Sequence, residues 1–186
     1  MIVKFFDIGS IKVSIRYHGK MLGLIAAVPT PINSHGRPII DLFISHCNWI
    51  LKHGCHGINI LGSTGEANSF DFKTRKKIMK AASLRLDKSR LMVGTGTPSL
   101  LETTNLTEFA DSLGYKIALV LPPYYYKPVS EKGLFSWYEE LHKKLGNRKI
   151  KIFFYNFPQL TGLTIPVDVI VSLHKRWPKR FIFMKN

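Results

Sequence analysis

Short apolar runs alternate with segments of helical character along the chain, and this alternation limits the folds that the chain can adopt. Each run is short enough for a strand that is buried on both of its faces. The runs lie at residues 23–28, 58–61, 91–95, 117–121, 151–155 and 181–184. Because strands that alternate with helices pair in parallel through right-handed crossovers, the pattern predicts an α/β fold with a parallel sheet.

The segments between the runs carry the spacing and the end signals of helices. In the first segment, apolar residues recur at helical spacing after Asp41, which is an N-cap residue type, and Gly54 follows as a stop signal. Ser130 and Pro166 mark the starts of two further helices. The sequence therefore predicts helices near residues 41–51, 71–86, 99–113, 131–145 and 166–175.

Two architectures fit this alternation, an open doubly wound sheet and a closed eight-stranded barrel. The length of 186 residues favours the open sheet, because a closed barrel takes about 250 residues. The repeat of roughly 30 residues favours the barrel, because it is about one eighth of that length. Pattern alone leaves both architectures open, and no linker or second domain is visible.

The composition is that of one globular domain without a membrane segment, because no stretch of about 18 apolar residues occurs. Charged residues interrupt the first twenty positions, which does not support a secretory signal. Two cysteines, Cys47 and Cys55, fit neither a disulfide framework nor a metal-ligand spacing. We therefore expect a reducing, cytoplasmic compartment.

Lysine and arginine outnumber aspartate and glutamate by 27 to 12, which gives a formal net charge of +15. Such an excess can mark a nucleic-acid surface. Here the basic residues are spread over segments 73–80, 143–144, 148–151 and 175–180, and no aromatic-interleaved motif accompanies them. The sequence therefore favours solvated outer helix faces and predicts no nucleic-acid partner.

A glycine-rich turn, Gly62 to Glu66, follows the apolar run at 58–61 and precedes a predicted helix. Backbone N–H groups in such a turn can cradle an anion, and the hydroxyls of Ser63 and Thr64 can donate to a carboxylate and pass protons. The Gly-Lys-Ser/Thr ending of a nucleotide-binding loop is absent. Taken alone, a plain strand-to-helix turn is the simpler interpretation.

Three adjacent tyrosines between prolines form the loop 122–128. Their rings suit packing against a helix or a neighbouring subunit, and taken alone the loop favours packing over catalysis. His53 and His56 lie around Gly54 without a further ligand at a suitable spacing, so they are interpreted as loop residues and no metal site is expected.

Tyr155 ends the fifth apolar run and Lys185 ends the sixth, so both are expected at the carboxyl edge of the sheet together with Ser63 and Thr64. Parallel α/β folds build their active sites at that edge. A lysine in an apolar setting can act as an amine nucleophile toward a carbonyl, and a tyrosine beside it can move protons. The alternative for Lys185 alone is a solvated residue.

Together these residues resemble the dihydrodipicolinate synthase and N-acetylneuraminate lyase family, the pyruvate-dependent class I aldolases built on a TIM barrel. The resemblance begins at Gly23 and ends at Met184-Lys185-Asn186. Between them the motifs are Pro-Thr-Pro at 29–31, Gly-Ser-Thr-Gly-Glu at 62–66, Pro-Tyr-Tyr at 123–125 and Tyr-Asn-Phe-Pro at 155–158. The resemblance favours the barrel and implies an incomplete TIM-barrel domain over 21–186, with about six of eight strand–helix units. Residues 1–20 are then an N-terminal extension of uncertain status.

The resemblance also implies roles for individual residues. Lys185 corresponds to the lysine that forms a Schiff base with pyruvate or a related 2-oxo acid, and Tyr155 to the proton relay. Ser63 and Thr64, with Gly62, correspond to the substrate-carboxylate site. Tyr125 corresponds to a tyrosine that reaches into a neighbouring subunit's site, which implies a homo-oligomer in full-length relatives. The lysine is itself the electron sink, so no metal or organic cofactor is implied.

Leu160 stands where dihydrodipicolinate synthases have an arginine, and Leu160-Thr161-Gly162 looks more like sialic-acid lyases and sugar-acid aldolases. The sequence therefore predicts an aldolase or lyase for a 2-oxo acid and an aldehyde, of the sugar-acid or sialic-acid type. The competing hypothesis is a catalytically inactive, truncated family member that only associates through its open barrel edges.

Overall fold

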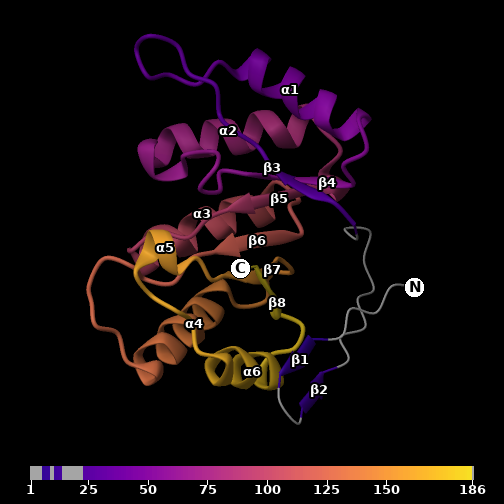
Figure 1. The fold of residues 1–186 in the computed structure, drawn as a ribbon. Coiled ribbons are helices and arrows are strands. Elements are labelled where there is room, and N and C mark those ends of the chain that lie inside the picture. The colour runs from indigo at the N-terminus through magenta and orange to yellow at the C-terminus, as the bar shows by residue number, and fades with distance from the viewer. Residues whose placement is uncertain (1–5, 9–10, 14–22, 186) are drawn as a thin grey trace.

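The computed structural model describes residues 6–8, 11–13 and 23–185, and its centre is a six-stranded parallel sheet (Figure 1). The strands follow one another in chain order, β3-β4-β5-β6-β7-β8. Their bounds are β3 Ile25–Ala27, β4 Gly57–Ile60, β5 Leu91–Gly94, β6 Ile117–Val120, β7 Lys151–Tyr155 and β8 Phe181–Lys185. All six predicted strands are thus confirmed, and their sequential order is that of a barrel, because a doubly wound sheet reverses its order at a switch point.

A helix follows each of the strands β3 to β7, as the sequence predicts. The long helices are α1 Ile40–Lys52, α2 Phe72–Arg85, α3 Leu100–Ser112, α4 Glu131–Leu145 and α6 Val167–Arg176. The sequence missed three short elements, the 3₁₀ turns η1 Ala67–Ser69 and η2 Lys88–Arg90 and the helical turn α5 Pro158–Thr161. Each is too short to produce a hydrophobic period.

Side-chain caps define where most of these helices begin. Asp71 accepts a hydrogen bond from the Thr74 N–H at 2.6 Å, and Ser130 accepts one from the Gly133 N–H at 3.0 Å, which confirms the predicted start at Ser130. The predicted N-cap at Asp41 is wrong. Helix α1 begins at Ile40, and its N-cap is Ile39. The Asp41 carboxylate instead accepts a hydrogen bond from Arg85 on α2 at 2.6 Å.

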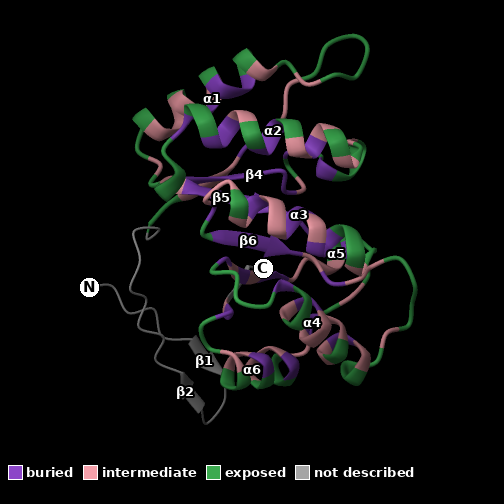
Figure 2. Ribbon diagram, turned by 180° about the vertical axis from the view of Figure 1, so that it is seen from behind, coloured by how far each residue is buried: buried purple, intermediate pink, exposed green. Residues whose placement is uncertain are grey.

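The two faces of the sheet have different neighbours, as in a barrel wall. On one face, alternate strand residues such as Val93, Val120 and Phe154 pack with residues of the helices into the main core. Figure 2 shows β4 and β6 as buried and buried positions alternating with exposed ones along α1, α2 and α3. On the other face, Met92, Ile117, Leu119 and Tyr155 form a second cluster. Since side chains alternate along a strand, β5, β6 and β7 each contribute to both clusters, and the second cluster lies on the concave face that carries the site.

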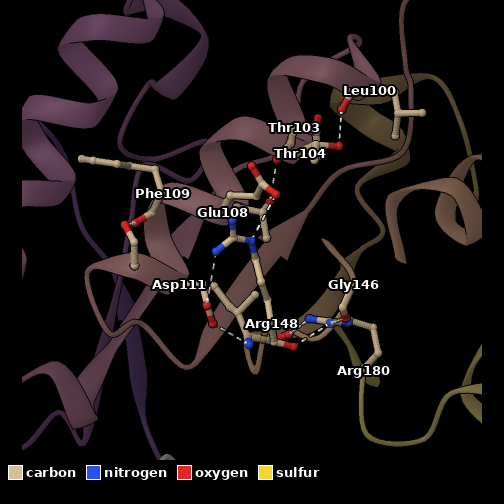
Figure 3. A network of polar contacts seen from close by, with 12 residues as sticks. Leu100, Thr103, Thr104, Glu108, Phe109, Asp111, Gly146, Arg148 and Arg180 are labelled. Carbon is tan, nitrogen blue, oxygen red and sulfur yellow. Dashed lines mark hydrogen bonds and ion pairs between the residues drawn. The ribbon is translucent and has the colours of Figure 1, made fainter. Parts of the chain in front are cut away.

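Two arginines, the buried Arg180 and the half-buried Arg90, hold loops together at the amino edge of the sheet. Arg180 donates to the backbone carbonyl oxygens of Gly146 at 3.0 Å, of Arg148 at 2.7 Å and of Ile150 (Figure 3). Arg90 likewise donates to the carbonyl oxygens of Leu51 at the end of α1 and of Cys55 and His56 in the loop that precedes β4. These carbonyls lie in the last turn of a helix or in the loop that follows it, where backbone acceptors lack intrahelical partners, so the guanidinium groups satisfy them.

The N-terminal region holds an antiparallel pair, β1 Phe6–Ile8 and β2 Ile11–Val13, which the sequence did not predict. The domain boundary predicted between residues 20 and 21 lies outside the described residues and stays a prediction. Among the described helices, none is both long and apolar enough to cross a membrane. The cytoplasmic compartment stays a prediction as well.

Candidate functional site

The glycine-rich turn at the end of β4 has a strained but well-anchored backbone. Leu61 directly precedes the turn and Glu66 is its last residue. Their φ angles are 53° and 49°, in the left-handed region that non-glycine residues seldom adopt. The Gly65 N–H donates to the Gly62 carbonyl at 3.1 Å, and the Thr30 hydroxyl donates to the Gly65 carbonyl at 2.9 Å. A residue of the Pro-Thr-Pro motif thus holds the turn in place.

Two glycines beside the turn, Gly94 and Gly96, allow neighbouring backbone segments to approach each other closely. A Cβ atom on Gly94, at the end of β5, would lie 1.9 Å from the Leu61 carbonyl oxygen. One on Gly96 would lie 2.4 Å from the Leu121 nitrogen. Neither position can carry a side chain without moving a neighbouring backbone segment, so both glycines are required for the shape of this edge.

The turn meets β7 through a hydroxyl pair. The Tyr155 hydroxyl donates to Ser63 Oγ at 3.1 Å, although the two residues are 92 positions apart in the chain. Tyr155 is only 6% exposed, and its ring stacks on Phe157 with centroids 5.6 Å apart. Burial and stacking fix the ring, so the phenol is held for proton transfer to or from a group beside Ser63.

A pocket of about 220 Å³ opens at this pair. Gly62, Ser63 and Tyr155 line it, so the structure brings these three predicted residues together. The polar side chains of Glu66, Asn68 and Ser69 and the exposed Leu160 also line it. Sequence reasoning missed the three polar residues, because they belong to the short turn η1 and its entry, which no periodic pattern announces.

Lys185 is placed through its backbone alone. It is the last residue of β8 and pairs in register with Tyr155 on β7, so the two chain positions lie side by side at the carboxyl edge. Its side chain lies outside the described part of the structure. The predicted role of this lysine therefore stays a prediction.

Two other predicted site residues do not line the pocket. Thr64 is exposed, and Tyr125 is 69% exposed with its ring edge-on to that of Tyr126 at 5.1 Å. The adjacent Tyr124 turns inward instead. Its hydroxyl bonds to Asn68, and partial burial raises the pKa of the Tyr124 phenol while nearby Arg75 acts to lower it.

The histidines near α1 are loop residues, as the sequence indicated. His53 lies at the end of α1, and Nδ1 of His56 accepts a hydrogen bond from the Leu24 N–H at 3.1 Å. Within the described ranges, no group of three or more histidine, cysteine, aspartate or glutamate residues is arranged to hold a metal ion.

The sequence of this chain matches one family of known proteins. Residues 20–181 match the sequence model of the Dihydrodipicolinate synthetase family. A 4-hydroxy-tetrahydrodipicolinate synthase of Rhizobium meliloti is 31% identical over 159 residues, which are 84% of this chain and 52% of that protein. The chain thus spans about half the length of the curated relatives that it matches.

Solved structures show the same fold. Dihydrodipicolinate synthase from Agrobacterium tumefaciens superposes with a TM-score of 0.85 and 30% identity, over 88% of this chain and 57% of that one. YagE of Escherichia coli, a family member solved in complex with pyruvate, has a TM-score of 0.78 and 27% identity, over 88% of this chain and 54% of that one. These proteins are TIM barrels, so the six strand–helix units correspond to part of such a barrel.

Proposed function

Because this chain belongs to the dihydrodipicolinate synthetase family, we propose that it carries the catalytic part of a Schiff-base-forming aldolase or lyase for pyruvate or a related 2-oxo acid. The observation that carries the proposal is the hydrogen bond from Tyr155 to Ser63 inside the pocket. It joins a proton-transfer group to a glycine-rich turn that suits a carboxylate, and Lys185 pairs with Tyr155 along the backbone. The pyruvate bound to YagE supports the 2-oxo acid.

In the proposed reaction, the Lys185 amine adds to the keto carbon and water leaves as the iminium forms. The iminium withdraws electrons, so the adjacent carbon can lose a proton to give an enamine, which then attacks an aldehyde. Tyr155 relays protons, and its hydroxyl partner Ser63 passes them on. Gly62 and Ser63, which line the pocket, hold the substrate carboxylate, and Thr64 contributes to this turn from outside the pocket lining. The scheme needs no metal or organic cofactor.

The outer pocket favours a hydroxylated aldehyde partner, as in sugar-acid or sialic-acid lyases. Ser69 and Asn68 offer a hydroxyl and an amide, and Leu160 is apolar. None of the described lining residues is basic, so none of these residues offers a cation for a second carboxylate. A polyhydroxylated chain would be bound by the neutral donors and acceptors instead.

Borohydride trapping tests the proposal. The chain is incubated with pyruvate and sodium borohydride, and the adduct is mapped by peptide mass spectrometry. We expect a carboxyethyl group on Lys185 that is lost in Lys185→Ala and retained in the control Lys179→Ala. Tyr155→Phe should slow trapping by about 10²-fold or more, since positioned acid–base catalysis contributes that much. A folded sample without any adduct on Lys185 would refute the proposal.

The competing function is association without catalysis. Within the described sheet, β3 and β8 are the terminal strands, and each has a hydrogen-bonded neighbour on one side. Exposed strand edges favour pairing with another chain. Concentration-dependent self-association by light scattering, together with no trapped adduct, would favour this alternative.

Tyr125 is proposed to contribute to the site of a neighbouring copy. Its 69% exposed side chain is available for such a contact. In a homo-oligomer, Tyr125→Ala should slow trapping, whereas the same substitution at the neighbouring Tyr126, which is 82% exposed, should leave it unchanged. Equal effects of the two substitutions would contradict this role.

A further inference from the structure

Sorting the charged residues by the two edges of the sheet shows that the positive charge is gathered at one of them. Five loops, 53–56, 86–90, 113–116, 146–150 and 177–180, connect a helix end to the start of the next strand. They hold seven lysines and arginines against one acidic residue, Asp87. The loops at the opposite, carboxyl edge hold Arg37 and Lys127 against Glu66 and Asp71, and are therefore neutral. Among these loops, the excess of positive charge therefore lies at the amino edge.

The three arginines at this edge have structural partners. Arg90 and Arg180 donate to backbone carbonyls, as described above. Arg148 pairs with Glu108 at 3.1 Å and lies 3.9 Å from Asp111. The three guanidinium groups are therefore already bound to carbonyl or carboxylate oxygens within the fold.

The four lysines have no such partners. Lys88, Lys116, Lys149 and Lys179 are all exposed, and none of their ammonium groups has an ion-pair or hydrogen-bond partner among the described residues. Each comes from a different loop, and these loops precede four neighbouring strands, β5 to β8. We define these four residues as the lysine row.

The strand register places the row along one edge. Ile117, directly after Lys116, pairs with Met92 on one side and with Lys151 on the other. The Lys88 side chain extends to the next loop, where a Cβ atom on Gly114 would lie 3.9 Å from Lys88 Nζ. Successive loops are therefore neighbours, and the four lysines follow one another along one edge, where none of the described ion pairs joins them to the nearby acids Asp87 and Asp111.

The spacing of the row matches a phosphate backbone. Neighbouring strands lie about 4.8 Å apart, so four successive strands span roughly 14 Å. One strand of a duplex carries a phosphate about every 3.4 Å along its axis, which gives about four phosphates over that length. Lysine ammonium groups bind phosphates as point charges and need no particular base.

The surroundings of the row favour a duplex over a protein or a single strand. Protein interfaces are rich in aromatic residues at their centre, and single-strand binding uses exposed aromatic rings for stacking. The aromatic residues of these loops are Tyr115, which is 1% exposed, and Trp177, which packs against Phe181 and His142. We propose that the lysine row binds the phosphate backbone of a nucleic-acid duplex without sequence preference, in addition to the proposed function.

This inference differs from the sequence-based expectation of no nucleic-acid partner. Along the sequence, the four lysines are separated by segments of about 30 residues and form no cluster. Only the topology brings their loops to one edge.

Fluorescence anisotropy with a labelled duplex of random sequence tests the proposal on the full chain. Four phosphate contacts predict a slope of about −3.6 for log K against log salt, which weakens binding about 150-fold between 50 and 200 mM salt. The variant K88Q/K116Q/K149Q/K179Q should lose most of this slope. The matched variant K73Q/K77Q/K80Q/K132Q, at four exposed lysines of α2 and α4, removes equal charge elsewhere and should keep it.

Circular dichroism confirms that both variants fold. Equal weakening in the two variants would mean that net charge alone attracts the duplex, and it would overturn the proposal. Absence of binding at 50 mM salt would overturn it too. Poly-glutamate that binds the lysine row as tightly as the duplex would assign the row to an acidic protein instead. None of these outcomes depends on Schiff-base trapping, so the two proposals fail separately.

Discussion

Replacing Arg180 by methionine should destabilise the chain by about 3 kcal/mol, because it removes the donor that closes the loop before β7. Arg180 is 6% exposed and donates to the carbonyl oxygens of Gly146, Arg148 and Ile150. A hydrogen bond from a charged donor contributes about 1.5–3 kcal/mol net. The total is smaller than three such bonds, because burying a guanidinium itself costs several kcal/mol. Gly146 and Arg148 are also exposed, so water can reach their carbonyls after the substitution.

Urea unfolding followed by circular dichroism measures this loss. With a slope of about 2 kcal/mol per molar urea, 3 kcal/mol lowers the midpoint by about 1.5 M. Lys179→Met is the matched control. Lys179 is exposed and has no partner among the described residues, so its replacement should stay within about 0.5 kcal/mol. Arg180→Lys should recover only part of the loss, since one ammonium cannot reproduce the planar fork of donors.

The reasoning would be refuted if Arg180→Met and Lys179→Met had the same midpoint. That result would mean that the three carbonyls find other donors at no cost, or that the desolvation of the guanidinium cancels its hydrogen bonds in full.

Three further predictions concern the site edge and the helices. Gly94→Ala should cost about 3 kcal/mol or more in urea unfolding, because its Cβ would lie 1.9 Å from the Leu61 carbonyl. Ser130→Ala should cost about 1 kcal/mol by the same assay, because it removes the cap of α4. Burial and then the charge of Arg180 lower the pKa of His142, so wild-type stability should fall as the pH drops below about 6.5, and His142→Phe should lessen that fall.

The fold was predictable because its signals are local and repeated. The six strands are runs of apolar residues that need burial on both faces, and the helix from 131 to 145 was predicted with its observed bounds. Asp41 misled the prediction, because the residue type of a cap also suits the first turn of a helix, where a carboxylate interacts with the helix dipole. The structure places Ile39 before that helix without a side-chain cap.

The site was predictable only in part. Ser63 follows the end of β4 and Tyr155 is the last residue of β7, and the parallel topology brings strand ends together. The inward turn of Tyr124 instead of Tyr125 depends on burial beside Asn68, which a run of three tyrosines does not reveal. Glu66 was missed as a pocket residue for a similar reason, since its left-handed backbone results from the tertiary packing of the turn.

The two edges of the sheet carry different chemistry. In a strand–helix repeat, successive loops along the chain lie alternately at the carboxyl edge and at the amino edge. Reading along the chain mixes the two sets of loops, so the +15 charge looks diffuse and the site residues look scattered. Separating the sets puts Ser63 and Tyr155 at the carboxyl edge, where the loops are neutral, and the lysine row at the amino edge. Substitutions in the lysine row should therefore change anion binding and leave the hydrogen bond between Tyr155 and Ser63 intact, because the length of a strand separates the two.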